Sequence, residues 1–326
     1  MDLTRLIAVA RGDAVADLLF VNAKIVNTFT GEIEEGAVAV AEGRVAGVGS
    51  YAEAERVVDL KGQYLCPGLI DGHVHIESSM FHVGQYARAV VPHGTVAVVT
   101  DLHEIANVAG IAGVRSVLDA ARRLPLDLFL MAPSCVPSTA LETSGAELGP
   151  AEIRQILRWK GARGLGEMMN FQGVIDADRS VLETITAADG RVLDGHAPRV
   201  RVKRLNAYLC PLVSCDHECV GYEEGLEKLR RGAHLMIREG STEKNLEALL
   251  PLVNDGNTTV ACWWWTTATP RTSIVMATWT PWCVKRSAWA WSRCGRCRWR
   301  RSTLRGTSAS TATGASVPDI TPTCWC

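Results

Sequence analysis

From residue 67 onward, short apolar runs alternate with helix-forming stretches, and this alternation limits most strongly what the chain can fold into. Seven successive strand–helix units favour a parallel sheet that closes into a (β/α) barrel over a single doubly wound unit. The predicted strands are Leu69–Val74, Thr95–Asp101, Leu126–Ala132, Gly164–Glu167, Arg191–His196, Leu212–His217 and Leu235–Arg238. The predicted helices are Ile111–Arg123, Ala151–Trp159, Ser180–Ala188 and Tyr222–Arg231.

Residues 1–66 carry a different pattern, in which short β runs are separated by turn residues such as Glu42-Gly43 and Lys61-Gly62. This favours a small antiparallel unit. The expected fold class is therefore α/β, with a (β/α)8-type TIM barrel over residues 67–257 and a small, β-sandwich-like N-terminal domain over residues 1–66. The eighth barrel strand is expected just after residue 250, where the pattern stops. We expect that strand to be missing or corrupted and the barrel to be incomplete.

The composition changes sharply at the same place. Residues 1–257 hold 34 of the 35 acidic residues and 25 of the 34 basic ones, but only one of the ten Trp residues. Residues 258–326 hold nine Trp, nine basic residues, six of the eleven Cys and one acidic residue, Asp319. Because an ordinary domain boundary rarely changes composition this much, we treat residues 258–326 as an aberrant tail rich in Trp, Arg, Thr and Cys.

The whole chain has the composition of a globular protein, with 47% hydrophobic residues and a formal net charge of −1. This charge argues against a dedicated nucleic-acid or membrane binder. No stretch approaches the ~20 apolar residues of a membrane span, and the first residues lack the pattern of a signal peptide. We expect a cytoplasmic protein with reduced cysteines and with neither nucleic acid nor membrane as a partner.

Histidines and carboxylates recur where the predicted strands end. His73 and His75 share one face at the end of the first strand, because residues i and i+2 of a strand point the same way. Two imidazoles on one face suit a shared cation, although a pair of surface histidines is the alternative. Later strand ends carry Asp101, His103, Glu104, Glu167, His196 and His217.

The carboxyl ends of barrel strands meet on one face, so these side chains are expected to gather there. Four histidines and a carboxylate would suit two divalent cations bridged by Glu167, and nitrogen and oxygen ligands favour Zn, Mn or Fe. Each side chain alone could instead cap a helix or satisfy a core hydrogen bond. Because a metal pair lowers the pKa of water, hydrolysis is the natural reaction class. The candidates for proton transfer or substrate positioning are Asp101, His103 and Glu104.

The segments around these positions resemble the amidohydrolase superfamily and, within it, the adenine deaminases of bacteria and archaea. The resemblance rests on PGLIDGHVHIESSM at 67–80, TDLHEIANV at 100–108, PSCVP at 133–137, ETSGA at 142–146, GLGEMMNF at 164–171, DGHAP at 194–198, DHEC at 216–219 and IREGS at 237–241. These segments belong to a stretch from about residue 17 to about residue 257, so the resemblance does not reach the tail.

The resemblance implies hydrolysis of adenine to hypoxanthine and ammonia, a reaction of purine metabolism, with two divalent cations (Mn, Fe or Zn) as cofactors. It implies a small-molecule substrate, adenine, and a homo-oligomeric assembly. Glu167 becomes the bridging, catalytic carboxylate, and the other metal ligands are His73, His75, His196 and His217. The candidate substrate contacts are Glu77, Ser78, Ser79 and Asn170.

The family pattern also contains an Asp-Asp-Arg-His segment after the eighth strand, and residues 258–326 lack it. Trp263-Trp264-Trp265-Thr266 must be encoded UGG UGG UGG ACN, which gives Val-Val-Asp when read from the third base of each codon. Suitable third bases further along permit Asp-Arg-His-Ala-Ala-Asp-Leu. We hypothesise that the gene or its determined sequence is frameshifted shortly before Trp263, so that the tail is out of frame and disordered and the activity is lowered or lost.

Other interpretations remain open. The same ligands would serve another cyclic amidohydrolase that acts on a ring amide, although Glu167 and the segment 101–104 weigh against it. The tail could form a zinc site through Cys294 and Cys297, or make the protein a non-catalytic binder of nucleic acid or of a membrane surface through the basic, aromatic run at 298–301.

Overall fold

The computed structural model describes residues 1–264 except 140, 255–256 and 258–260. The hypotheses on the tail beyond residue 264, including its zinc and nucleic-acid alternatives, therefore lie outside the described residues. The chain divides into two compact units, residues 1–68 and a unit that begins at Leu69. In the described part of the chain, no helix combines the length and the hydropathy needed to cross a membrane.

The first unit is a mixed sheet of order β3-β2-β1-β4, with β5 also paired to β1. Strands β1, β2 and β3 are antiparallel neighbours, whereas β4 and β5 run parallel to β1. The predicted antiparallel unit is therefore wrong for β4 and β5, because the chain returns to the side of β1 that β2 leaves unpaired. The described residues of this unit form a single sheet, and a sandwich is not confirmed. The strands are β1 (Ala16–Val26), β2 (Ile33–Ala41), β3 (Arg44–Gly49), β4 (Ala54–Asp59) and β5 (Tyr64–Leu65).

A helix that the sequence analysis did not predict, α1 (Leu3–Arg11), completes the first unit. The Asp2 carboxylate accepts hydrogen bonds from the first turn, and Gly12 ends the helix in the left-handed conformation with φ 81°. Val9 is buried against a cluster that includes Leu19 and Ala39 of the sheet. These two caps are the local signal that could have revealed the helix.

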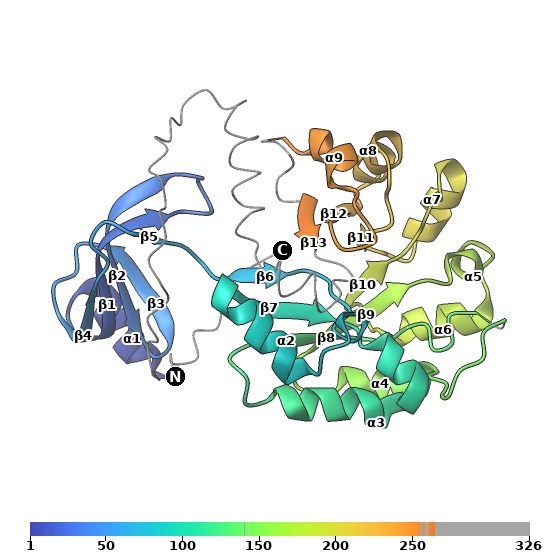
Figure 1. Ribbon diagram of the computed structural model, residues 1–326, viewed down its shortest axis with the longest axis horizontal. Helices are drawn as coiled ribbons and strands as arrows, with labels where there is room; N and C mark the ends of the chain where they lie inside the picture. Colours follow the sequence, from blue (N-terminus) through green and yellow to red (C-terminus); the bar gives the residue numbers. More distant parts are fainter. Residues whose placement is uncertain (140, 255–256, 258–260, 265–326) are drawn as a thin grey trace. The chain divides into compact units, whose positions relative to one another are not determined.

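The second unit repeats a parallel strand followed by a helix (Figure 1). One sheet has the order β10-β9-β8-β7-β6 and a second the order β11-β12-β13, with a bridge between Leu193 and Val213 linking them. This α/β arrangement is consistent with a TIM-type barrel. The strands are β6 (Leu69–Asp71), β7 (Thr95–Thr100), β8 (Asp127–Ala132), β9 (Ala162–Met168), β10 (Val192–Gly195), β11 (Cys215–Asp216), β12 (His234–Arg238) and β13 (Ala261–Trp264).

The eighth strand was expected to be missing or corrupted, and it is not missing, because the four-residue strand β13 lies beside β12. β13 runs parallel to β12, in a register that pairs Leu235 with Ala261 and Arg238 with Trp264. Parallel pairing depends on main-chain hydrogen bonds. A short run of residues that favour β structure can therefore pair with β12 even when the family motif does not follow it. Among the described residues, no pairing between β13 and β6 closes the sheet.

All four predicted helices are confirmed, with shifted bounds. The predicted helix 111–123 is the later part of α3 (His103–Ala121), whose two segments meet at Gly110, a break with φ 58° and ψ −150°. The other three are α4 (Pro150–Leu157), α6 (Arg179–Ala187) and α8 (Tyr222–Arg230). The helical segments not predicted are α2 (Val83–Val90), α5 (Phe171–Ile175), α7 (Val202–Leu209), α9 (Leu246–Leu249) and the 3-10 turns η1 (Glu77–Ser79), η2 (Val91–His93) and η3 (Leu250–Leu252).

Helices pack on the strands through one large apolar core. Leu130 of β8 and Leu165 of β9 are buried together with Ile153 and Ile156 of α4. Burying one such side chain stabilises the fold by roughly 1.5–3 kcal/mol relative to leaving it in water. The packed helices hold the strands in place, which fixes where their carboxyl ends, and the side chains on them, meet.

Candidate metal centre

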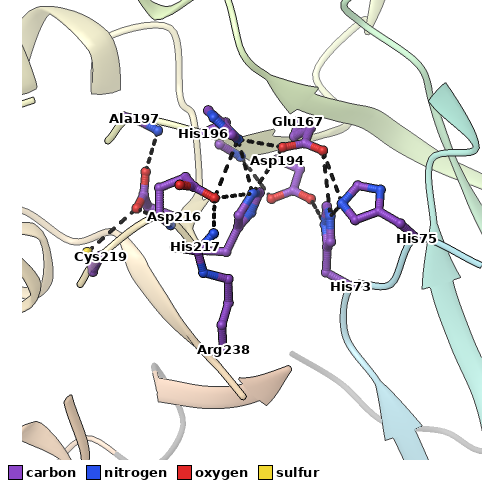
Figure 2. A network of polar contacts seen from close by, with 12 residues as sticks. His73, His75, Glu167, Asp194, His196, Ala197, Asp216, His217, Cys219 and Arg238 are labelled. Atoms are coloured by element: carbon purple, nitrogen blue, oxygen red, sulfur yellow. Dashed lines mark hydrogen bonds and ion pairs between the residues drawn. The ribbon is translucent and has the colours of Figure 1, made fainter. Parts of the chain in front are cut away.

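Residues from five strand ends that are far apart in the sequence converge on one buried cluster. Figure 2 shows those that come from the ends of β6, β9, β10 and β11. His73 and His75 follow β6, and Asp101 and His103 follow β7. Glu167 lies on β9, while His196 follows β10 and His217 follows β11. The predicted gathering of these side chains is confirmed by the contacts between them.

Glu167 lies at the centre of the cluster, and its two carboxylate oxygens face different histidines (Figure 2). Oε1 lies 3.3 Å from Nε2 of His75 and 3.2 Å from Nδ1 of His103. Oε2 lies 2.6 Å from Nδ1 of His196 and 3.0 Å from Nε2 of His217. A carboxylate whose oxygens are divided between two groups of rings has the arrangement needed to bridge two cations.

Ring nitrogens also face one another across the cluster. Nε2 of His73 lies 3.1 Å from Nε2 of His75, and Nδ1 of His196 lies 3.2 Å from Nε2 of His217. Two ring nitrogens at this distance either share a proton or converge on a cation. The spacing is therefore compatible with a shared ion between each pair.

The donor atoms fit divalent cations in number, chemistry and burial. Three overlapping groups have donors within 4.8 Å of one another: His75, Asp101, His103 and Glu167; His73, Asp194 and His217; and Glu167, His196 and His217. The donors are nitrogen and oxygen atoms, which suit Zn, Mn and Fe without selecting one of them. Glu167 and His73 are almost completely buried, and such charged groups are retained inside proteins when they are paired or bind metal.

Asp194 belongs to the cluster, and the sequence analysis did not predict it as a site residue. Its Oδ2 lies 2.6 Å from Nδ1 of His73, and its Oδ1 lies 2.8 Å from Sγ of Cys215. A carboxylate on the far nitrogen of a histidine fixes the ring so that the other nitrogen faces the site. Asp194 precedes His196 by two positions, so the same i, i+2 rule that grouped His73 with His75 could have identified it.

A second polar group borders the cluster at the start of α3. Nδ1 of His103 lies 3.0 Å from Oδ2 of Asp101. The Ser78 hydroxyl donates a 2.9 Å hydrogen bond to Oε1 of Glu104, and the same oxygen lies 3.4 Å from Nδ1 of His75. The three candidate proton-transfer residues thus lie beside the candidate metal ligands.

Burial and neighbouring charges shift the pKa values of these groups. Burial opposes the charge on His103, but the Asp101 carboxylate outweighs it and raises the pKa of His103 to about 11. Burial also opposes the charge on His73, but the Asp194 carboxylate outweighs burial and raises the pKa of His73 to about 9. Burial, together with the Glu104 carboxylate, raises the pKa of Glu77 to about 7. At His217 burial dominates and lowers the pKa.

The four predicted substrate contacts take part in local hydrogen bonds. Ser79 is buried and donates to the Ile76 carbonyl, and Asn170 caps α5 by accepting from the Gly173 amide. Glu77 accepts from the Ile105 amide over 3.4 Å, which leaves it beside the start of α3. Ser78 donates its hydrogen bond to another candidate site residue, Glu104.

An ion pair between the buried Arg238 and the half-buried Glu218 adjoins the cluster and was also not predicted. Oε1 of Glu218 lies 3.6 Å from Nε2 of His217, and Arg238 is the last residue of β12. Its place at a strand end is the signal that could have drawn attention to it.

Comparison with known sequences agrees with this geometry. The chain belongs to the amidohydrolase family, whose profile matches residues 64–261. It is 56% identical over 254 residues to an adenine deaminase of Dehalococcoides mccartyi (strain CBDB1), a match that covers 78% of this chain and 44% of the relative. It is 53% identical over 256 residues to an adenine deaminase of Archaeoglobus fulgidus, covering 78% of this chain and 46% of the relative. The chain thus spans about half the length of these curated relatives.

Among solved structures, the chain is similar to N-isopropylammelide isopropylaminohydrolase from Burkholderia multivorans, with a TM-score of 0.54 and 16% identity. The match covers 87% of this chain and 82% of that one. At this identity the likeness supports the fold alone.

Proposed function

We propose that this chain carries the metal site of a hydrolase that converts adenine and water to hypoxanthine and ammonia. The observation that carries the proposal is Glu167, whose two oxygens face two separate groups of histidines within hydrogen-bonding distance. The substrate is proposed from relatives that are named adenine deaminases and are 53% and 56% identical to this chain.

His73, His75, His196, His217 and Glu167 are the residues that would hold two divalent cations. Mn²⁺, Fe²⁺ and Zn²⁺ all suit this donor set. Divalent cations in such a site act as Lewis acids and bring the pKa of water toward neutrality. The role of the protein is to hold the ligands at fixed spacing and to keep Asp194 on the far side of His73, so that the ring presents Nε2 to the site.

Proton transfer is assigned to the group at the start of α3. Asp101 holds Nδ1 of His103, which leaves Nε2 to carry a proton toward the leaving amino nitrogen of the substrate. Oε2 of Glu104 lies 3.6 Å from that Nε2 and is the proposed second proton carrier. Of the candidate substrate contacts, Ser78 and Glu77 border this group, whereas Ser79 and Asn170 would act by shaping η1 and the start of α5.

We propose a homo-oligomeric assembly and a role in purine metabolism on the resemblance alone. A (β/α)8-type barrel with boundaries at residues 66 and 257 is proposed from the strand–helix pattern, and a cytoplasmic location from the composition and the first residues. The out-of-frame origin of residues 258–326 is proposed from the codons that the Trp residues require.

The test is ammonia release from adenine by the 326-residue protein loaded with Mn²⁺ or Fe²⁺, beside a Glu167→Gln variant. We expect the unsubstituted protein to release ammonia and the variant to lose this activity, because an amide cannot supply two anionic oxygens to two cations. Metal content, measured on both proteins, should fall in the variant.

A folded, metal-loaded protein that releases no ammonia from adenine would contradict adenine deamination by this chain. Hydrolysis of a ring amide such as hydantoin, with adenine untouched, would instead support the cyclic amidohydrolase alternative. The two substrates therefore separate the two interpretations within one experiment.

A further inference from the structure

Two polar side chains from helices behind the cluster reach the backbone next to three of its candidate ligands. They are Tyr208 of α7 and Lys228 of α8, both almost completely buried. Their hydrogen bonds go to backbone groups beside the candidate ligands and to the carboxylates of Asp216 and Glu224.

Tyr208 connects the ends of β9 and β10. Its hydroxyl donates to the Met168 carbonyl over 3.0 Å and accepts from the His196 amide over 2.8 Å. Met168 is the residue after Glu167, so one oxygen atom sets the distance between the backbones that carry Glu167 and His196. Their side chains meet at 2.6 Å, between Oε2 and Nδ1.

Lys228 connects the ends of β10 and β11. Its ammonium donates to the Ala197 carbonyl over 2.7 Å and to Oδ1 of Asp216 over 2.9 Å. Asp216 in turn accepts from the Ala197 amide through Oδ2 over 2.7 Å (Figure 2). Ala197 follows His196 and Asp216 precedes His217, so both polar groups of the Ala197 backbone are tied to the strand that carries His217.

The charge of Lys228 is compensated where it lies. Its third contact is Oε1 of Glu224, at 3.0 Å, and that oxygen also accepts from the Arg199 amide. All three N–H groups of this buried ammonium can donate to an oxygen acceptor, and these hydrogen bonds hold the loop after His196 in place.

We propose that Tyr208 and Lys228 are positioning residues that hold Glu167, His196 and His217 at the spacing needed to share one cation. The inference rests on the proposed metal site. It predicts an unequal defect, because the hydrogen bonds described for both residues reach the backbone beside Glu167, His196 and His217 and not the backbone beside His73 and His75. Since Glu167 faces both groups of rings, loss of either positioning contact should weaken the cation proposed for His196 and His217 more than the other.

The test is titration of the metal-free 326-residue protein with Co²⁺, followed by visible absorption and by metal content after gel filtration. Tyr208→Phe removes one oxygen atom and keeps the packing of the ring. We expect binding of one equivalent of Co²⁺ to weaken about 10–100-fold and its absorption band to change, with a smaller effect on the other equivalent. Lys228→Met should show the same unequal loss.

Tyr51→Phe is the matched control, because it deletes the same atom from a tyrosine whose hydroxyl donates to the Ala10 carbonyl in the first unit. It should bind both equivalents as the unsubstituted protein does. A folded Tyr208→Phe protein with unchanged Co²⁺ binding and spectrum would overturn the positioning role and leave the proposed metal site standing.

Absence of Co²⁺ binding by the unsubstituted protein would overturn both proposals together. Circular dichroism reports whether each variant folds. If Tyr208→Phe does not fold, Lys228→Met carries the same comparison. If neither folds, the two residues serve the fold itself and the positioning role is overturned.

Discussion

At the scale of single residues, the chemistry of the site depends on charges that would be costly if each were buried alone. Glu167 is almost completely buried, and burial opposes its charge, yet the rings led by His217 hold its pKa well below its usual range. A buried carboxylate persists when its neighbours compensate it. The surrounding rings thus compensate the charge of Glu167, and a cation bound there would take over this role.

His103 is the residue whose proposed role differs most clearly from that of a ligand. In a His103→Gln variant we expect kcat for adenine deamination to fall by about 10²–10⁴-fold, because a positioned general acid is lost. Metal content should remain at the level of the unsubstituted protein. Steady-state kinetics and metal analysis on the same preparation give both numbers.

A loss of one metal equivalent in His103→Gln would contradict the assignment. His103 would then be a ligand, as its 3.2 Å approach to Oε1 of Glu167 also permits.

Much of the site could be predicted from residue patterns. Spacing placed His73 beside His75, and the strand–helix rhythm placed Asp101, Glu167 and the later histidines at strand ends. Asp194, Tyr208 and Lys228 were not predicted. The i, i+2 spacing to His196 could have identified Asp194, whereas Tyr208 and Lys228 are helix side chains behind strands, and such side chains have no distinctive spacing in the sequence. Their roles depend on contacts between residues 12 to 121 positions apart.

At the scale of elements, the backbones of β10 and β11 lie so close together that a side chain on Gly195 would not fit between them. A Cβ built on Gly195 would lie 2.0 Å from the Cys215 carbonyl oxygen of the neighbouring segment. In Gly195→Ala we expect a loss of stability of about 1–3 kcal/mol, because the backbones must separate. His196 follows directly, so metal binding should weaken as well. Urea unfolding and Co²⁺ titration measure the two effects.

Gly221 provides the comparison for this substitution, since a Cβ there meets no atom within 4 Å and its φ of −142° suits any residue. Gly221 is the N-cap of α8, so Gly221→Ser, which adds a Cβ and keeps a favoured N-cap residue, should leave stability and metal binding close to those of the unsubstituted protein. Equal effects at both positions would argue against close strand packing as the cause.

In the first unit, helix α1 is joined to the sheet by charged groups. Arg5 forms an ion pair with Asp17 of β1, and Asp17 also accepts from the Glu42 amide over 2.7 Å. The hydrogen bond from Arg5 is the largest influence and lowers the pKa of Asp17 below 3.8. A depressed carboxyl pKa contributes stability that is present above the unfolded-state pKa and is lost as the pH falls through the folded-state value.

Asp17→Asn should therefore lower the free energy of unfolding at pH 7 by about 0.2–1 kcal/mol, because the pair is partly exposed. The difference from the unsubstituted protein should shrink as the pH falls below about 3.8. Urea unfolding at pH 7 and pH 3 measures it, with Asp119→Asn, an exposed pair with Arg122, as the control. A difference that persists unchanged at pH 3 would exclude the charge as its origin.

At the scale of the whole molecule, the family match ends at residue 261, close to the break in composition. The frameshift hypothesis makes a prediction about DNA. Sequencing the source gene around the codons for residues 255–266 should reveal that a single-base insertion or deletion restores the Asp-Asp-Arg-His motif in a continuous frame. If no single-base change joins the two segments, the hypothesis is wrong and residues 258–326 are a genuine alternative ending.

A chain with the restored reading frame should deaminate adenine faster than the 326-residue chain. The physical reason is the added aspartate, since a positioned proton carrier typically contributes about 10²–10⁴-fold. Ammonia release by the two proteins under identical metal loading measures the ratio, and equal rates would show that the aspartate is dispensable or replaced.

The sequence by itself determined the alternation of strands and helices and the placement of ligand-type residues at strand ends, because periodicity and i, i+2 spacing are local properties. Tertiary structure decided the rest. Strands β4 and β5 run parallel to β1, and β13 adds to β12, because these pairings join segments that no local pattern relates. The packed helices also set the distances between strand ends. These distances allow the two oxygens of Glu167 to contact two groups of rings, and they allow Tyr208 and Lys228 to contact the backbone beside the ligands.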